Sequence, residues 1–349
     1  MSVVEELSSG HVPAPPAPPR GSLFRAELHR FRARRFIRLL LLLASLGWVL
    51  AVVIALLHYG TPTAADHAQA RQSMQQLIAE SEQSRQQCLQ NPQAQGAPPG
   101  IPPEEACPSP IQPSDLNENS FLPKQPFDFG GSSGRGAIGF GAAAAVLGFV
   151  IGATWIGAEW SSRSLVALLF WVPRRMSVFG AKIAVLTLAS ALLGIVAEAA
   201  WLAMAALLRA VAGNGRALPA HFWSGLFATQ GRAVLLTVLI ALLGFGLTNL
   251  IRNTGAALGV GFVYFAIVET AVRILRPTWE PWLLSDNAVG LLAPGGTVIY
   301  IQDGTPGPNG LVQPTEYVIG SLQGGVLLGA VTVVVVGIGV VLFARRDIH

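Results

Sequence analysis

Charged and hydroxyl side chains gather in one short segment that interrupts long apolar runs. Residues 157–175 read GAEWSSRSLVALLFWVPRR. From Leu165 onward, apolar residues recur at the i, i+3, i+4, i+7 spacing of one helix face, and Pro173 ends that pattern. Glu159 lies four residues before Arg163, which is the favourable order for an ion pair contributing roughly 0.2–0.5 kcal/mol. The pattern predicts a short amphipathic helix at a membrane surface, with its polar side free for a partner protein. A simple surface turn is the alternative interpretation.

Two glutamates fall inside apolar runs, where an ionisable group is costly and usually faces protein or water. Glu198 lies in GIVAEAAWL, past the middle of its run. It either lines a translocation path or makes an interhelical hydrogen bond. Glu269 lies four residues before Arg273, so an ion pair between them is favoured, and a place on the path is the alternative for Glu269.

The sequence contains two cysteines, Cys88 and Cys107, and both lie in one long polar segment. If that segment is outside the cytoplasm, the thiols are expected to form a disulfide. Closing such a loop contributes about 3 kcal/mol in the chain-entropy model. Two free thiols are the alternative, and a zinc site is disfavoured because His67 is the only further ligand nearby.

Other catalytic patterns are missing from the sequence. It has no H-E-x-x-H metal motif, and neither Lys124 nor Lys182, its only lysines, lies in a phosphate-binding P-loop. An intramembrane serine protease would need a histidine within a span, but His58 is at the edge of a run and His221 is in a loop. We therefore expect a non-enzymatic chain with no catalytic residue, no metal site and no cofactor of its own.

The elements that must position these residues are membrane spans. The sequence is 52% hydrophobic and 12% charged, whereas soluble domains carry about 25% charged residues. Six apolar runs are near the ~20 residues that cross a bilayer as a helix, and they lack the alternation of barrel strands. The predicted fold is an all-α polytopic membrane protein. Its spans are expected over 36–59, 136–160, 183–208, 233–250, 255–275 and 324–343. Between and around them we expect a disordered tail over 1–21, an elbow helix over 22–35, outer loops over 60–135, 209–232 and 276–323, a cytoplasmic coupling loop over 161–182, and a tail over 344–349. The third outer loop is expected to hold a short helix and a hairpin.

Positive charge gives the orientation. Of the 23 basic residues, 14 fall beside alternate ends of the runs, on one side of the predicted membrane. The positive-inside rule makes that side cytoplasmic, so both termini are expected inside. The first run starts too late and is too long for a signal peptide, and is interpreted as a retained span. The net charge of +4 therefore reflects topology and membrane lipid, and no nucleic-acid partner is expected.

A basic segment precedes the first run. In SLFRAELHRFRARR, Phe24, Leu28 and Phe31 share one helix face while the arginines lie mostly elsewhere. This predicts an elbow helix in the plane of the headgroups, near anionic lipid. A cluster of charges that only sets topology is the alternative.

The segment 157–175 also carries a resemblance. Gly-x-Glu-Trp, then Ser164-Leu165, Leu168-Leu169, Pro173, Arg175 and Lys182 resemble the permease subunit of type-2 ABC transporters, in a branch associated with high-GC Gram-positive bacteria. Glu27 in the basic helix and FARRD after the last run fit the same family. The resemblance covers the chain from about Leu23 to the end, apart from the first outer loop. The family often has Gly-Thr where this chain has Arg163-Ser164. Serine keeps the hydroxyl of threonine, but arginine is larger than glycine and adds a charge. This difference bears on the identity of the partner.

The resemblance implies a role as the permease of an exporter in the bacterial cytoplasmic membrane. A separate ATP-binding-cassette subunit would bind ATP and Mg and contact the loop after the second span, and a second permease copy or a related permease would complete the path. The cargo could be an antibiotic, a lipid or a peptide. Residues implied in coupling to the ATP-binding subunit are Glu159, Trp160, Arg163, Ser164, Pro173, Arg174 and Arg175. The alternatives are a secondary transporter, or a membrane anchor that presents the first outer loop as an interaction domain.

Overall fold

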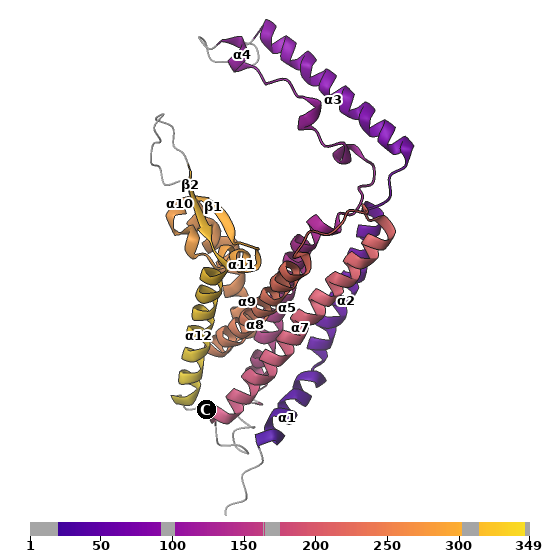
Figure 1. The fold of residues 1–349 in the computed structure, drawn as a ribbon. Coiled ribbons are helices and arrows are strands. Elements are labelled where there is room, and N and C mark those ends of the chain that lie inside the picture. The colour runs from indigo at the N-terminus through magenta and orange to yellow at the C-terminus, as the bar shows by residue number, and fades with distance from the viewer. Residues whose placement is uncertain (1–19, 92–101, 163, 165–174, 302–313, 346–349) are drawn as a thin grey trace, which may run out of the picture.

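The computed structural model describes residues 20–91, 102–162, 164, 175–301 and 314–345 (Figure 1). In this part of the chain, six helices are long and apolar enough to cross a membrane, as expected for an all-α polytopic fold. Their direction alternates along the chain, so α1 and the last turn of α12 lie at one end of the bundle (Figure 1). We call this the α1 end, and the opposite end the α3 end. The six helices are α2 (Arg35–His58), α5 (Phe129–Ser161), α7 (Arg175–Ala212), α8 (Phe222–Ile251), the continuous helix from α9 to α10 (Thr254–Leu275), and α12 (Ser321–Arg345).

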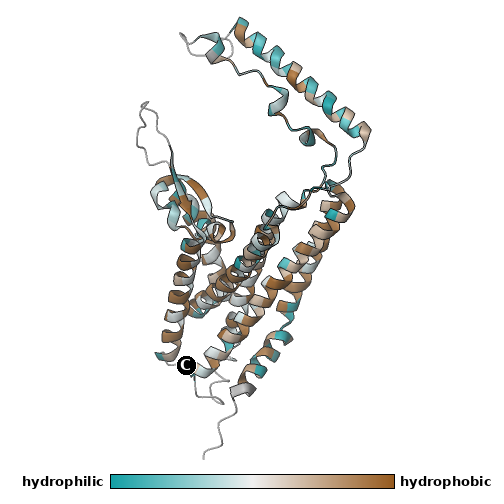
Figure 2. Cartoon of the chain, viewed as in Figure 1, coloured by the Kyte–Doolittle hydropathy of each residue, from teal (hydrophilic) through white to brown (hydrophobic). Residues whose placement is uncertain are grey.

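The helices of the bundle are mainly hydrophobic, whereas α3 (Ala64–Gln90), which stands away from the bundle, is mostly hydrophilic (Figure 2). On α2, Leu42, Leu46 and Leu57 are each more than 60% exposed. A soluble domain rarely exposes so continuous an apolar face, whereas lipid tails solvate it well. The surface therefore supports a multi-pass membrane protein.

Helix α8 is central and packs against α5, α7 and α12. Small residues permit this, as their four-residue spacing in α5 predicts: a Cβ added at Gly152 would overlap the carbonyl oxygen of Ala241, and one at Gly244 would overlap that of Phe149. By contrast, a Cβ at Gly259 or Gly329 would meet no atom of the described chain within 4 Å. Gly259 and Gly329 therefore do not serve packing among the described residues, whereas Gly324 of α12 does, because a Cβ there would overlap the Asn287 carbonyl oxygen.

Several helices extend beyond the apolar runs expected from sequence. Helix α7 starts at Arg175, so residues 175–182, expected in a loop, form its first two turns. Helix α5 starts at Phe129 and α8 at Phe222, each before its expected span. Hydropathy locates the segment that hydrocarbon can cover, but a helix continues into polar sequence wherever its polar side chains find partners.

Helix α1 (Arg20–Ala33) is present where the basic helix was expected. Its apolar stripe packs against the bundle: Phe31 is buried, and Phe24 and Leu28 lie against the same core cluster. The Phe31 ring meets the Trp155 ring edge-on, with 5.2 Å between centroids. The stripe thus joins α1 to α5.

Helix α3 (Ala64–Gln90) stands away from the bundle at the α3 end (Figure 1). It starts with a capping box in which the Thr63 hydroxyl accepts from the Asp66 N–H and the Asp66 carboxylate accepts from the Thr63 N–H. The hydrogen bonds that the Asp66 carboxylate accepts from the Thr63 N–H and from the Thr63 hydroxyl lower the pKa of the exposed Asp66. The predicted disulfide between Cys88 and Cys107 is present and ties the end of α3 to α4 (Pro103–Ala106). The chain then returns to the bundle through the short turns η2 (Pro113–Asp115) and η3 (Glu118–Phe121).

The segment before α12 holds the short helix and the strand pair expected there. After α9 (Thr254–Val263), the π-helical turn η4 (Tyr264–Val268) and α10 (Glu269–Leu275), the chain forms η5 (Pro277–Trp282) and α11 (Leu284–Leu292). Strands β1 (Thr297–Ile301) and β2 (Thr315–Ile319) then pair antiparallel, with Thr297 opposite Ile319.

Candidate functional site at the α1 end

A buried ion cluster joins three helices at the α1 end. The Lys182 ammonium on α7 lies 2.7 Å from Glu27 Oε2 on α1 and 2.7 Å from Glu159 Oε2 on α5. It also donates to Glu159 Oε1 at 2.9 Å. The exposed fractions of the Lys182, Glu27 and Glu159 side chains are 1%, 0% and 6%. One cation therefore bridges two carboxylates with almost no water around them.

Two arginines complete the cluster from its edge. Arg34 donates to Glu159 Oε1 at 3.1 Å and to the Thr154 carbonyl at 3.4 Å, while Arg30 lies 2.9 Å from Glu27 Oε1. Each carboxylate thus has two cationic partners. Burial lowers the pKa of the Arg34 guanidinium, and the Glu159 and Glu27 carboxylates oppose that shift. Arg34 stays charged, because an arginine pKa starts far above neutral pH.

Aromatic rings close the cluster toward the bundle core. The Lys182 ammonium lies 5.2 Å from the centroid of the Trp155 ring, at cation–π distance. Trp155 itself is 1% exposed and packs on Phe245 as well as on Phe31. In such dry surroundings the cluster is costly to break, because removing one partner leaves an uncompensated buried charge.

The position of the cluster along the chain gives it its functional interest. Glu159 is the third residue from the end of α5, which ends at Ser161. Lys182 lies two turns into α7. These two residues flank segment 162–174, which contains the predicted amphipathic helix. Since Glu27 bonds to the same ammonium, α1 is fixed to both flanks of that segment at once. The arrangement therefore joins α1, α5 and α7 through one ammonium group.

The residues predicted to couple to a partner lie in different surroundings. Glu159 was expected to pair with Arg163, which lies outside the described residues, and Lys182 and Arg34 are the ion-pair partners of Glu159 among the described residues. The Trp160 indole N–H donates to Asn249 Oδ1 at 3.2 Å, and its ring lies under the Arg252 guanidinium, 4.6 Å away.

On the surface, the Ser164 hydroxyl is exposed and accepts from the Ser162 hydroxyl. Arg175, at the start of α7, donates at 3.5 Å to the carbonyls of Phe343 and Ala344 on α12. Arg163, Pro173 and Arg174, with the rest of the predicted amphipathic helix, lie outside the described residues. The structure therefore places Glu159 and Trp160 in contacts with the helix bundle just before segment 162–174, whereas Ser164 within that segment is exposed.

Glu198 is a second buried carboxylate, in the middle of α7. Its exposed fraction is 4%, and neither carboxylate oxygen has a hydrogen-bond partner in the described part of the chain. The neighbouring Gln230 amide on α8 donates to the Glu198 backbone carbonyl at 3.4 Å. A Cβ added at Gly141 on α5 would lie 3.2 Å from Glu198 Oε1. The carboxylate is therefore enclosed by α5, α7 and α8, and its place on a translocation path stays a prediction.

Glu269 has a structural explanation. Its carboxylate accepts from the Ser285 N–H at 3.0 Å and from the Ser285 hydroxyl, which anchors the start of α11. The predicted pair with Arg273 is present at 3.6 Å, and Arg273 also reaches Asp286 at 2.9 Å and Glu280 at 3.5 Å. Burial raises the pKa of Glu280, and the Asp286 charge adds to that rise. This network joins α10 to η5 and α11.

Two features of the sequence could have predicted the ion cluster. Lys182 is one of two lysines in the chain, and Glu27 shares a helix face with Phe24 and Phe31 in an otherwise basic segment. A lone acid on the apolar face of one helix requires a buried cation, and Lys182 was available for that role. Assigning Lys182 to a loop concealed the pairing.

Within the described ranges, no three histidine, cysteine, aspartate or glutamate side chains gather closely enough to hold a metal ion. Comparison with protein-family models gives no match, and no curated protein matches the sequence significantly.

Proposed function

We propose that this chain is the permease subunit of an ABC exporter of the type-2 class, and that a separate ATP-binding subunit acts on segment 162–174. The observation that carries the proposal is the ion cluster, in which Lys182 binds Glu27 and Glu159 and so fixes α1 to both flanks of that segment. A load applied to the segment would reach α1, α5 and α7 as one body. The sequence resemblance of the segment supplies the nature of the partner.

The long helix α7 would carry the movement across the membrane. It has 38 residues, so at 1.5 Å per residue it is about 57 Å long, more than a bilayer is thick. Glu198 lies on this helix and faces α5 and α8. We propose that displacement of α7 against α8 opens the enclosed region around Glu198, and that cargo passes there or between this permease and a second copy or a related permease.

The proposed orientation puts the α1 end in the cytoplasm of a bacterial cell, with both termini inside. Arginines of α1 and the ends of α7 and α12 supply the positive charge at that end. The disulfide between Cys88 and Cys107 lies at the opposite end, where an oxidising exterior would keep it formed. ATP and Mg would bind only to the partner subunit.

The proposal is tested by cross-linking from Ser164 in segment 162–174. Ser164→Cys introduces a thiol at an exposed position of segment 162–174, and Ser224→Cys introduces a matched thiol at an exposed position at the α3 end. The native cysteines are held in their disulfide and stay unreactive. In membranes from the native cells, we expect Ser164→Cys to cross-link to a protein that contains a P-loop, and Ser224→Cys to give no such product.

The same membranes should yield a complex whose ATPase activity depends on this chain. A purified chain with no nucleotide-hydrolysing partner and no cross-link from Ser164→Cys would overturn the proposal. That result would favour a secondary transporter or a membrane anchor for α3.

A further inference from the structure

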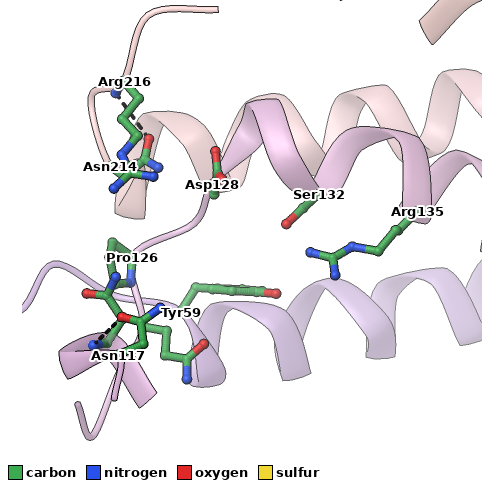
Figure 3. Close-up of a pocket in the computed structure, with 10 residues that line it drawn as sticks. Tyr59, Asn117, Pro126, Asp128, Ser132, Arg135, Asn214 and Arg216 are labelled. Carbon is green, nitrogen blue, oxygen red and sulfur yellow. Dashed lines mark hydrogen bonds between the residues drawn. The ribbon is translucent and has the colours of Figure 1, made fainter. Parts of the chain in front are cut away.

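A polar cavity lies at the α3 end, where three candidate spans meet. Its volume is about 440 Å³, within the range of small-ligand sites. It is bordered by Tyr59 at the end of α2, by Asp128, Ser132 and Arg135 at the start of α5, and by Arg216 after α7 (Figure 3). Its lining side chains are mainly amides, hydroxyls and charged groups, so it suits a polar ligand.

The walls of the cavity are fixed by backbone hydrogen bonds. The Phe127 N–H donates to the Ala212 carbonyl at 2.7 Å, and the Asn214 N–H donates to the Phe127 carbonyl at 3.1 Å. The Tyr59 ring packs edge-on against the buried Phe127 ring, with 5.1 Å between centroids. The ends of α2, α5 and α7 are thereby held together, so the cavity is formed before any ligand arrives and little ordering is needed on binding.

In the described part of the chain, the positive side chains of the cavity outnumber its negative side chains. Among the ion pairs of the described residues, none involves Arg135 or Arg216. Among the described residues, Asp128 is the only carboxylate that borders the cavity. The lining side chains of the cavity therefore carry a net charge of +1. A group with a single negative charge would neutralise it.

The depth of Arg135 indicates where that negative group comes from. Asp128, Ser132 and Arg135 are spaced i, i+4, i+7 and share one face of α5, on which Ser132 and Arg135 point toward the space beside Tyr59 (Figure 3). Arg135 is about 10 Å further along the helix than Asp128, toward the apolar part of the bundle. An unpaired guanidinium at the level where a span begins is adjacent to lipid headgroups.

We propose that this cavity binds a phosphodiester, and that its source is the headgroup of a membrane phospholipid. Arg135 and Arg216 would hold the phosphate oxygens through charge-assisted hydrogen bonds, and the Tyr59 and Ser132 hydroxyls would donate to the remaining oxygens. A phosphodiester carries one negative charge, which matches the cavity. A free phosphodiester without acyl chains has the same recognition chemistry and is the other source that the test must separate. The proposal does not depend on the exporter assignment.

The test uses the purified full-length chain in a neutral detergent and follows its thermal unfolding as a probe is added. The lipid probe is dihexanoyl phosphatidylglycerol, and its phosphate-free control is dihexanoyl glycerol. Glycerophosphoglycerol, the same phosphodiester without acyl chains, represents the free source. A ligand that binds only the folded state raises the unfolding midpoint, and the shift grows with the logarithm of the ligand concentration relative to its Kd. We expect the lipid probe to raise the midpoint and the phosphate-free control to leave it unchanged.

The variants Arg135→Gln and Arg216→Gln should each weaken the apparent affinity for the lipid probe by about tenfold or more, as expected for loss of a hydrogen bond between charged groups. Arg135→Lys keeps the charge and should retain part of the affinity. The matched control is Arg276→Gln, an exposed arginine at the same end that does not border the cavity. Because all three arginines are exposed, these variants should unfold at the wild-type midpoint without a probe.

The possible results separate clearly. Binding of the lipid probe alone, lost in the cavity variants, supports the headgroup site. Equal binding of glycerophosphoglycerol, with the same losses, supports a phosphodiester site and overturns the lipid source. No binding of either phosphate probe, or equal weakening by Arg276→Gln, overturns the proposal.

Discussion

Glu159 and Glu198 are almost equally buried, yet their carboxylates have opposite surroundings. Their exposed fractions are 5% and 4%. Glu159 has Lys182 and Arg34 within 3.1 Å, whereas Glu198 has no ion pair and no carboxylate hydrogen bond in the described part of the chain. Both belong to the packed helices α5 and α7.

The difference separates two reasons for burying a charge. A carboxylate with cations around it joins the elements that carry them, so Glu159 contributes to the position of the helices. A carboxylate without partners only costs free energy in the resting structure. Its presence then has to be explained by another state of the protein, such as one in which α7 has moved against α8.

Lys182→Met is the variant with the largest expected effect, and it tests whether the cation of the ion cluster stabilises the fold. Methionine fills a similar volume but leaves Glu27 and Glu159 without their shared cation. We expect a loss of about 3–5 kcal/mol in the free energy of unfolding, the usual cost of an uncompensated buried charge. Thermal or denaturant unfolding of the detergent-purified chain measures it.

The control for that variant is Lys124→Met, which changes the only other lysine at an exposed position. It should leave the free energy of unfolding within about 0.5 kcal/mol of wild type. Equal effects of the two lysine variants would show that the ion cluster contributes nothing to stability.

Glu159→Gln should have a smaller effect, because Lys182 keeps Glu27 as a partner. Loss of a hydrogen bond to a charged group predicts about 1.5–3 kcal/mol. Combining Glu159→Gln with Lys182→Met removes a cation and a carboxylate together, so the double variant should be less destabilised than the sum of the single variants. Additive losses in this double-mutant cycle would mean that the two side chains do not interact.

Glu159→Gln should also weaken the link to ATP hydrolysis under the proposed function. The amide cannot form ion pairs with Lys182 and Arg34, so α5 is held less firmly to α1 and α7. In the complex with the ATP-binding subunit, we expect ATPase activity to persist while transport per ATP falls. A parallel fall in both activities would indicate loss of assembly instead.

Sequence reasoning anticipated the parts of the structure that depend on local pattern. The apolar runs located the six long helices, the glycine spacing in α5 indicated its close contact, and the strand pair followed from a turn-rich segment between two short apolar runs. The Cys88–Cys107 disulfide could be proposed because no other cysteine competes.

The ion cluster and the cavity depend on contacts between distant segments, which spacing does not reveal. Glu27 and Lys182 are 155 residues apart, and Glu159 was assigned a local partner four residues away because that pair is visible in sequence. Likewise, Arg135 and Arg216 share a cavity only because the Phe127 backbone bridges the start of α5 to the end of α7. Local pairs are visible in sequence, whereas partners from distant segments become visible only in the folded chain.

Glu198→Gln gives the smallest predicted effect and the sharpest contrast with Glu159→Gln. Since neither Glu198 oxygen has a hydrogen-bond partner in the described residues, the amide removes a charge and breaks no contact. We expect unfolding free energy to stay unchanged or to rise by up to about 1 kcal/mol, because burying an amide costs less than burying a charge. If the enclosed region around Glu198 opens during transport, the same variant should lower transport while leaving ATPase activity and stability intact. A loss of stability as large as that of Glu159→Gln would show that Glu198 has a partner in the folded protein and would end the contrast between the two carboxylates.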